Sequence, residues 1–368
     1  MSNVFYRKYR PKRFEEFVNQ EYVIQTLTNA IKKETISHAY LFSGPRGVGK
    51  TTLARIFAKA INCQKRKMGE FEPCDQCPSC QEINEGKTLD LIEIDAASQG
   101  RIEEVRDLKE RIKFSPASLK YKVFILDEAH QLSKDAANAL LKTLEEPPSH
   151  AIFILATTEV HKMIPTILSR CQRFDFKRLK IKDIVQNLEK ICLAEKIETE
   201  AGVLELVAQN AEGSLRDAQN LLDQLFAVFG QDKKITLQEV RLMIGYVPSE
   251  IVFKIVDFLL RKQLKEAIFY LNELYEKGMN FEELTKKVVL CFQKILEAKI
   301  VNERIEDFER ELTEEQIEKI YQWAHILKEE DIRKILEILI STLAKMRYSV
   351  FPQLPLELAF VSIINLLK

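Results

Sequence analysis

A glycine-rich segment that ends in lysine and threonine carries the strongest chemical signal in the sequence. It runs from Gly44 to Thr51 as GPRGVGKT, follows a predicted strand and opens a predicted helix over Thr52–Ile61. In such a place the glycines let backbone amides converge on phosphate oxygens, and the start of the helix adds favourable partial charge. We expect Lys50 to reach the outer phosphates of ATP and Thr51 to ligate Mg²⁺; the alternative is a glycine-rich turn with a chance lysine. The residues expected to contact the nucleotide here are Gly44, Pro45, Arg46, Gly47, Val48, Gly49, Lys50, Thr51 and Thr52.

An acidic pair follows the apolar run Val123–Leu126 further along the chain. We expect Asp127 to hold the magnesium ion and Glu128 to orient or deprotonate a water molecule. The pair could instead cap the next helix. Another predicted strand ends at Thr157 and Thr158, at the edge of the sheet where ligands of open α/β folds bind. One of these hydroxyls could sense the γ-phosphate, although threonine is also common in strands.

Four cysteines are crowded into a short segment and have the spacing of metal ligands. Cys63, Cys74, Cys77 and Cys80 supply four thiolates, which is enough to close a tetrahedral zinc site. Because no position stays open for water, such a zinc would be structural and not catalytic. An iron-sulfur cluster is the alternative. The remaining cysteines lie far apart and are expected to be small buried side chains: Cys171, Cys192 and Cys291.

The hydrophobic pattern predicts two kinds of element to position these residues. Up to about Phe176, short β-rich runs alternate with helical periods, which is typical of a parallel sheet with crossover helices. The predicted strands are Ala39–Phe42, Leu91–Ile94, Val123–Leu126 and Ile152–Ala156. After Arg178 the pattern is helical to Leu367, with a helix over Ser214–Phe229 and a capping box at Thr236–Glu239. The expected fold class is α/β followed by all-α.

Length and composition limit the class of protein. At 368 residues the chain exceeds what one hydrophobic core usually serves, so two or three domains are expected. Hydrophobic residues make up 46% and charged residues 30%, the balance of a soluble globular protein. Basic and acidic residues number 55 each, so any DNA contact must come from local geometry. No apolar run approaches the roughly 20 residues of a membrane span, and Met1–Arg10 has no export signal, so we expect a cytoplasmic protein without membrane contact.

Further motifs resemble those of one family. Ile164–Cys171 reads IPTILSRC, and Gly213–Asp217 reads GSLRD. Together with the phosphate loop, the acidic pair and the two threonines, they look like an AAA+ clamp-loader ATPase. More detailed likenesses are Tyr9–Pro11, Phe14–Gln20, His38–Ser43, Glu93–Ser98, Leu140–Pro148 and Pro355–Phe360. Over essentially the whole chain, the sequence resembles the gamma/tau subunit family of bacterial DNA polymerase III.

The resemblance implies an architecture and a function. It implies an AAA+ P-loop domain over 1–178 with a zinc module inserted at 63–80, a helical lid over 179–245 and a helical collar over 246–368. Without it, the last helical block is equally well explained as a bundle whose apolar faces pack together. Family members form a five-subunit arc with delta and delta-prime type subunits, in which each ATP lies at an interface. ATP binding would open and grip a sliding clamp, and hydrolysis triggered by primer-template DNA would release it, in the bacterial cytoplasm at the nucleoid-associated replisome.

The resemblance also implies roles for single residues. Arg170, in the Ser-Arg-Cys motif, would reach the γ-phosphate bound by the neighbouring subunit as an arginine finger; alone it would be interpreted as a surface ion pair. Arg216 would be the second sensor, which links the lid to nucleotide in the same subunit, and the alternative is a helix-face arginine paired with an acidic neighbour. The residues expected to bracket the adenine are Tyr9, Arg10, Pro11 and Val18.

A helix predicted over Ile102–Phe114 is the candidate for DNA contact. It carries Arg101, Arg106 and Lys109 at its start and along its length. Such residues can hold DNA phosphates, with little base specificity and a strong dependence on salt. Acidic residues alternate with these bases, so a solvated charged face is the alternative.

Two other functions compete with clamp loading: an AAA+ motor that translocates along DNA, and a nucleotide-binding scaffold without hydrolysis. The Ser-Arg-Cys motif and the four-cysteine insert favour the clamp loader over the motor. The intact phosphate loop, the acidic pair and Arg170 argue against the scaffold. The longer tau form of this family continues into regions that bind helicase and polymerase. This sequence ends at Lys368, so we expect a short form or a truncation without those regions.

Overall fold

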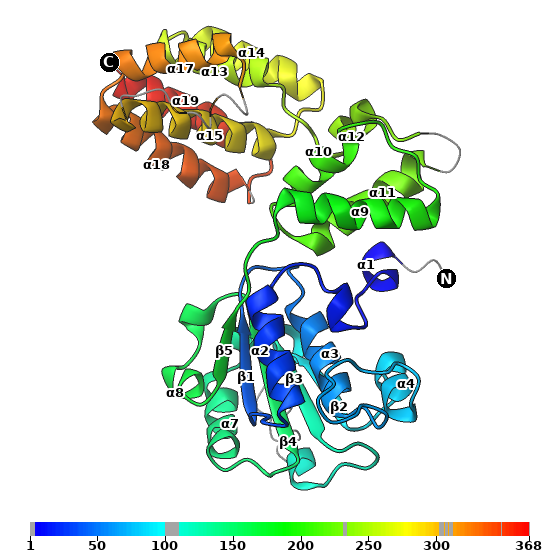
Figure 1. Ribbon diagram of the computed structural model, residues 1–368. Helices are drawn as coiled ribbons and strands as arrows, with labels where there is room; N and C mark the ends of the chain where they lie inside the picture. Colours follow the sequence, from blue (N-terminus) through cyan, green and yellow to red (C-terminus); the bar gives the residue numbers. More distant parts are fainter. Residues whose placement is uncertain are drawn as a thin grey trace. The chain divides into compact units, whose positions relative to one another are not determined.

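The chain forms two compact units in a computed structural model, Met1–Val240 and Arg241–Lys368 (Figure 1). The structure describes residues 4–99, 110–230, 234–301, 305, 308, 312–346 and 348–367. The boundary between the units falls within one helix, α12 (Leu237–Met243). Each unit is described by itself.

The first unit contains a five-stranded sheet in which all neighbouring strands are parallel, in the order β2-β3-β4-β1-β5. The strands are β1 (Ala39–Ser43), β2 (Leu91–Asp95), β3 (Lys122–Asp127), β4 (Ala151–Thr157) and β5 (Gln172–Asp175). The four strands predicted from the sequence are confirmed to within about a residue at each end. The edge strand β5 was not predicted, because Phe174 is its one buried residue and no apolar run marks it.

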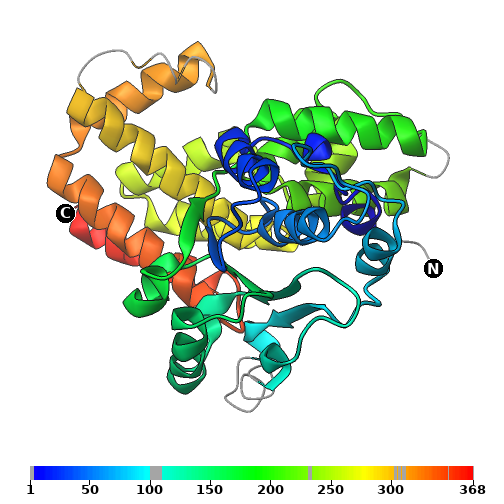
Figure 2. The same ribbon diagram turned by 60° about the horizontal axis from the view of Figure 1, so that its bottom comes forward.

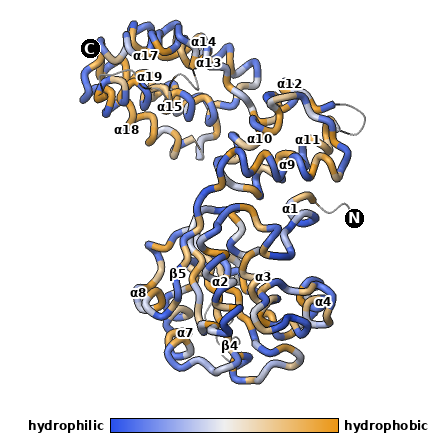
Figure 3. Tube along the Cα trace, viewed as in Figure 1, coloured by the Kyte–Doolittle hydropathy of each residue, from blue (hydrophilic) through white to orange (hydrophobic). Residues whose placement is uncertain are grey.

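The central strands β1, β3 and β4 are buried along almost their whole length because both faces of the sheet are covered. On one face the Tyr40 ring packs against Phe57 of α3 (Lys50–Ile61), with ring centroids 4.9 Å apart. On the other face Leu41 joins a buried cluster that includes Leu140 of α7 (Lys134–Glu145). Figure 2 shows α3, in blue, and α7, in green, on opposite sides of the sheet. In Figure 3 hydrophobic positions gather along these strands, as a doubly covered parallel sheet requires.

The α/β part of this unit contains further helical elements besides α3 and α7. They are α1 (Phe5–Lys8), η1 (Phe14–Glu16), α2 (Glu21–Lys32), α4 (Pro78–Glu85), α5 (Ala96–Gln99), η2 (Ala129–Gln131), η3 (Val160–Lys162) and α8 (Pro165–Leu168). Because the strands are parallel, their carboxyl ends meet at one edge, and the segments after β1, β3 and β4 carry the phosphate loop, Glu128 and Thr158.

Helices follow the sheet in the same unit. They are α9 (Ile181–Glu195), α10 (Val203–Asn210), α11 (Leu215–Phe229) and the first part of α12. Ser214 begins α11 by accepting a hydrogen bond from the Asp217 amide at 3.3 Å. The predicted capping box is confirmed: the Thr236 amide donates to Glu239 Oε2 at 2.8 Å, and the Glu239 amide donates to Thr236 Oγ1 at 3.3 Å.

The second unit is helical throughout its described residues. Its helices are α13 (Ser249–Leu260), α14 (Leu264–Glu276), α15 (Phe281–Val301), α17 (Glu314–Ile326), α18 (Glu329–Met346) and α19 (Leu354–Leu366). The long helix α15 packs against α17 and α18, and its Phe292 and Ile295 are fully buried in one continuous core. The expected fold class, α/β followed by all-α, is therefore confirmed. No helix in the described part of the chain is long and apolar enough to cross a bilayer.

Candidate functional site

The loop between β1 and α3 adopts a conformation that requires its glycines. Gly47 and Gly49 have φ values of 76° and 101°, in the left-handed region that disfavours side chains. A Cβ at Gly47 would lie 1.9 Å from Ser214 Oγ, and one at Gly49 would lie 2.4 Å from the ring of Phe17. The loop is thus enclosed by the start of α11 and by the N-terminal segment, and α3 begins directly behind it at Lys50.

Lys50 is buried beside the loop, with 6% of its surface exposed. Its Nζ donates hydrogen bonds to the carbonyl oxygens of Gly44 and Pro45 at 2.8 and 2.7 Å. Burial lowers the pKa of Lys50, and the charges of Glu128 and Asp127 oppose that shift. The ammonium group is therefore held at the loop, where an anionic ligand would stabilise its charge.

The predicted metal ligands lie together at the end of β3. Thr51 Oγ1 donates to Asp127 Oδ2 at 2.7 Å, so the hydroxyl and the carboxylate face one point. The amide of Glu128 donates to the other oxygen of Asp127 at 2.9 Å. A hydroxyl beside a carboxylate is an oxygen donor set of the kind that Mg²⁺ prefers. The residues present therefore fit a magnesium ion bound next to the phosphate loop.

Glu128 has an unusual backbone and a fixed side chain. Its φ of 47° lies in the left-handed region, which is uncommon for residues other than glycine and is often found at functional sites. Thr158 Oγ1, at the end of β4, donates a hydrogen bond to Glu128 Oε2 at 3.0 Å. The other predicted sensor, Thr157, instead contacts His130 Nδ1 through its hydroxyl at 3.0 Å. Neither threonine lines the cavity: Thr158 contacts the Glu128 carboxylate, and Thr157 contacts His130.

A cavity of about 360 Å³ joins these groups. Predicted nucleotide contacts that line it are Arg10, Pro11, Val18, Arg46, Gly47, Val48, Gly49, Lys50, Thr51, Thr52, Asp127, Glu128 and Arg216. Gly44 and Pro45 contribute the carbonyls that hold Lys50 and do not line the cavity. Tyr9 also lies outside the lining, since its hydroxyl donates to the carboxylate of Glu195.

Several lining residues were not predicted from the sequence. They are Tyr6, Phe17, Asp95, Ala97, Leu179, Leu215 and Gln219. Tyr6 lies next to the predicted sensor, because the Arg216 guanidinium is 4.8 Å from the centre of its ring. Phe17, Asp95, Ala97 and Leu215 lie in the family-like segments 14–20, 93–98 and 213–217, which did not identify them as lining residues. Tyr6, Leu179 and Gln219 lie outside those segments, and their place in the lining depends on contacts between distant parts of the chain.

Positive charge is concentrated beside this cavity. Burial lowers the pKa of Arg10, and the charges of Arg55 and Arg216 lower it further. Arg55 is paired with Glu93, while no carboxylate among the described residues forms an ion pair with Arg10 or Arg216. Arg10 and Arg216, which have no such ion pair in the described part of the chain, would be stabilised by an anionic ligand. The polyphosphate of a nucleotide has that charge.

Arg170 lies outside the cavity of its own chain. It follows α8, and its guanidinium donates to the carbonyl oxygen of Thr166, to Ser169 Oγ and to Glu145 Oε1 at 2.8, 3.1 and 2.6 Å. The pair with Glu145 is partly exposed, and pairs of this kind contribute little to folding stability. This geometry is that of a surface ion pair.

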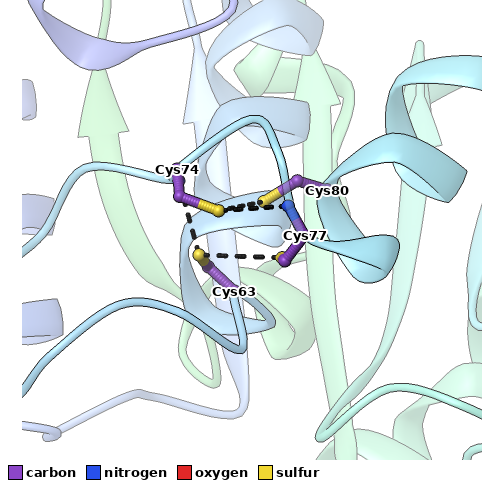
Figure 4. Close-up of side chains that lie close together, drawn as sticks. All are labelled: Cys63, Cys74, Cys77 and Cys80. Atoms are coloured by element: carbon purple, nitrogen blue, oxygen red, sulfur yellow. Dashed lines mark hydrogen bonds between the residues drawn. The ribbon is translucent and has the colours of Figure 1, made fainter.

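The four clustered cysteines converge on one point (Figure 4). Their sulfur atoms all lie within 4.8 Å of one another, and the Cys63–Cys77 and Cys74–Cys80 pairs are 4.0 Å apart. A tetrahedral zinc ion with bonds of about 2.3 Å would separate its sulfur ligands by about 3.8 Å. All four are free thiols and not disulfides. The donor set therefore fits a tetrahedral metal ion.

The environment of these thiols favours a bound cation. The pKa of Cys77 is lowered to about 6: burial alone would raise it, but hydrogen bonds from the backbone amides of Cys80 and Gln64 outweigh that effect. Burial raises the pKa values of Cys63 and Cys80. The Cys77 thiolate therefore forms readily, whereas Cys63 and Cys80 are stabilised as thiolates by a bound cation. The remaining cysteines are dispersed, and burial raises the pKa of Cys192 to about 11 and that of Cys291 to about 12.

The helix predicted to contact DNA, Ile102–Phe114, begins outside the described part of the chain, as do its basic residues Arg101, Arg106 and Lys109.

Three protein families match successive parts of the chain. Residues 19–180 match the family described as "DNA polymerase III, delta subunit". Residues 183–231 match "DNA polymerase III clamp loader subunit, ATPase lid domain". Residues 235–368 match "DNA polymerase III subunits gamma and tau domain III".

Curated relatives resemble the chain over most of its length. DNA polymerase III subunit gamma of Buchnera aphidicola from Acyrthosiphon pisum is 35% identical over 98% of this chain and 98% of its own. Subunit tau of Bacillus subtilis is 41% identical over 97% of this chain and 62% of its own, and subunit tau of Escherichia coli is 42% identical over 79% and 45%. The chain thus spans between about half and two thirds of these tau subunits. On these matches, the chain belongs to the gamma/tau subunit family of bacterial DNA polymerase III.

Proposed function

We propose that this chain is an ATPase subunit of the DNA polymerase III clamp loader, which uses ATP to open a sliding clamp and place it on primed DNA. The observation that carries the proposal is the meeting of the phosphate loop, Asp127 and Glu128 at one cavity in a chain of this family. A nucleotide-binding scaffold would not need Glu128 fixed beside the phosphate site. The carboxylate therefore favours hydrolysis.

The lining residues that were predicted from the sequence have the following roles in this proposal. The amides of the phosphate loop and Lys50 bind the phosphates of ATP, and Arg216 senses their charge from α11. Thr51 and Asp127 hold Mg²⁺, which neutralises developing phosphate charge when bound. Glu128 orients the attacking water or accepts its proton. Arg10, Pro11 and Val18 line the side of the cavity assigned to adenine, together with Tyr6 and Phe17.

The proposal requires a second chain at each active site. Because Arg170 lies outside its own cavity and near the surface, it can enter the cavity of a neighbouring subunit once its bond to Glu145 is broken. The partners proposed are clamp-loader subunits of the delta and delta-prime type in a five-subunit arc. The P-loop domain (1–178) and lid (179–245) would bind nucleotide, and the collar (246–368) would hold the arc together.

We assign zinc to Cys63, Cys74, Cys77 and Cys80, in a structural role, since four thiolates leave no ligand position for water. DNA contacts are proposed through phosphates, with Arg101, Arg106 and Lys109 as candidates. The place of action proposed is the bacterial cytoplasm, with the replication machinery at the nucleoid.

A Glu128→Gln chain tests the proposal by separating ATP binding from hydrolysis. Assembled with the delta-type subunits, it is expected to bind the clamp in an ATP-dependent manner, because the phosphate loop is intact. Transfer of labelled clamp to primed circular DNA is expected to be lost at the release step, since release requires hydrolysis. Glu34→Gln, which changes an exposed carboxylate elsewhere in the same unit, is the control. Normal hydrolysis and release by the Glu128→Gln complex would exclude the role assigned to this residue.

A further inference from the structure

Two carboxylates within the four-cysteine segment contact the rest of the nucleotide-binding unit. We call residues 63–80 the cysteine module. Its Glu72 accepts the backbone amide of Phe14 through Oε2 at 3.1 Å and that of Glu15 through Oε1 at 3.0 Å. These amides open the short helix η1, where backbone donors have no partner within the helix. Glu72 therefore caps η1 from a distant part of the sequence with both of its oxygens.

Asp75 lies inside the module, between Cys74 and Cys77, and has partners on two further elements. Its Oδ1 accepts hydrogen bonds from Lys59 of α3 and from Asn84 Nδ2, the latter at 3.2 Å. Its Oδ2 accepts a hydrogen bond from Arg13 Nε at 3.3 Å. The Lys59 side chain is almost wholly buried, with 2% exposed, and the Asp75 side chain is 20% exposed, so this ion pair is largely shielded from solvent. Asp75 thus joins the module to the helix behind the phosphate loop and to the residue that precedes η1.

Aromatic packing strengthens the same junction. Phe14 is buried, with 2% of its surface exposed, and its ring centre lies 6.1 Å from that of Phe71 in the module. Lys32 Nζ of α2 lies 4.6 Å from the centre of the Phe71 ring, on which it can form a cation–π contact. The module therefore holds η1 by charge, by hydrogen bonds and by apolar contact.

The capped helix leads directly to the cavity wall. The Phe17 amide donates to the carbonyl oxygen of Phe14 at 3.0 Å, which closes the turn of η1. Phe17 and Val18 line the nucleotide cavity, and the Phe17 ring lies so close to Gly49 that a Cβ there would clash with it. A shift of η1 would therefore move one wall of the cavity against the phosphate loop.

We propose that Glu72 and Asp75 are positioning residues of the nucleotide site, through which a metal ion held by the four cysteines raises nucleotide affinity. The inference rests on the proposed nucleotide-binding function. Between 62 and 77 the module has no helix or strand, so its shape depends on what its side chains bind. A metal ion with four ligands would fix that loop and place both carboxylates for η1 and α3. Without the ion, ordering this loop costs conformational entropy before Glu72 can cap η1.

The test measures the affinity of the full chain for a fluorescent ATP analogue, with zinc bound and after removal of zinc by a chelator. Chelation is expected to weaken binding by about tenfold in the native chain, the scale of losing charge-assisted hydrogen bonds. Glu72→Ala with zinc bound is expected to show a similar loss and to keep its zinc. Chelation of that variant then has a smaller effect than in the native chain, because the Glu72 connection is already broken and only the Asp75 connection remains. Glu70→Ala, an exposed residue of the same module that contacts the Lys67 amide, is expected to respond like the native chain.

A second readout reports on position and not on affinity. Hydrogen exchange at the amides of Phe14 and Glu15 is expected to accelerate after chelation and in Glu72→Ala, with circular dichroism unchanged. If Glu72→Ala does not fold, Glu72→Gln replaces it, since the amide oxygen can accept one of the two hydrogen bonds and an intermediate loss is expected.

The inference is overturned if chelation weakens binding equally in Glu72→Ala and in the native chain, if it leaves affinity unchanged, or if Glu72→Ala loses its zinc. Failure of the zinc-bound native chain to bind the ATP analogue contradicts the proposed function itself, which distinguishes the two failures.

Discussion

The hydroxyl of Thr158 reaches Glu128 from the end of the neighbouring strand. Because Thr158 does not line the cavity, its substitution should leave ATP affinity unchanged while altering the position of the carboxylate. In Thr158→Val, a hydrogen bond to a charged group is removed, so we expect turnover in the assembled complex to fall by about tenfold. The rate of ATP hydrolysis at saturating ATP measures turnover. Nucleotide titration of the isolated chain measures ATP affinity.

Thr158→Ser is the matched control, since it keeps the hydroxyl, and it is expected to retain most of the activity. Equal turnover in Thr158→Val and the native chain would show that Glu128 does not need this hydrogen bond.

At the residue scale, the sequence predicted the groups whose chemistry depends on local spacing. The phosphate loop, the Asp127–Glu128 pair and the four cysteines are short motifs, and the structure brings the members of each motif together. Tyr6 and Glu72 could not be predicted, because their partners Arg216 and Phe14 lie far away in the sequence. Their importance follows from tertiary contacts that leave no periodic pattern.

The contact between the phosphate loop and α11 belongs to the scale of elements. The loop carbonyl of Gly47 accepts the Arg216 amide at 3.4 Å, and Ser214 Oγ fills the space where a Gly47 side chain would be. In Gly47→Ala, strain at φ 76° and this clash should separate the two elements. We expect nucleotide affinity to fall by about tenfold or more and stability to fall by about 1 to 3 kcal/mol. Nucleotide titration and urea unfolding measure the two effects.

Gly86→Ala separates the clash from backbone strain. Gly86 lies outside the cysteine module and also has a positive φ, 66°, but a Cβ there would meet no atom within 4 Å. The variant should therefore lose some stability and keep its nucleotide affinity. If both glycine variants bind nucleotide like the native chain, the contact with α11 does not contribute to the site.

Strands were predicted from the sequence where apolar residues run together or alternate over several positions. The strands β1, β3 and β4 are buried on both faces, so an uninterrupted apolar run marks each one. The edge strand β5 has a single buried residue, Phe174, and gives no such signal. The strand order is likewise set by long-range pairing, which composition and periodicity do not report.

At the scale of the whole molecule, the central question is how chains cooperate. The nucleotide cavity has its loop, metal ligands and acidic residue within one unit, yet the predicted arginine finger lies outside it. The sequence pointed to Arg170 through family resemblance and not through any spacing of its own. Partner subunits, clamp and DNA cannot be read from a single chain, because their recognition depends on surfaces of other molecules.

The most direct test is ATP turnover by the reconstituted clamp loader, with and without sliding clamp plus primed DNA, using native, Arg170→Ala and Arg173→Ala chains. Arg173 is exposed and pairs with Asp175 of its own strand, so it is the matched control. We predict that clamp and DNA together raise turnover in the native and Arg173→Ala complexes. In Arg170→Ala the stimulated rate should fall by about a thousandfold, with unchanged ATP affinity of the isolated chain. Two results would contradict the proposal that neighbouring subunits of a clamp loader share each ATP site. One is stimulated turnover that persists in Arg170→Ala, and the other is turnover in the native complex that does not change when clamp and DNA are added.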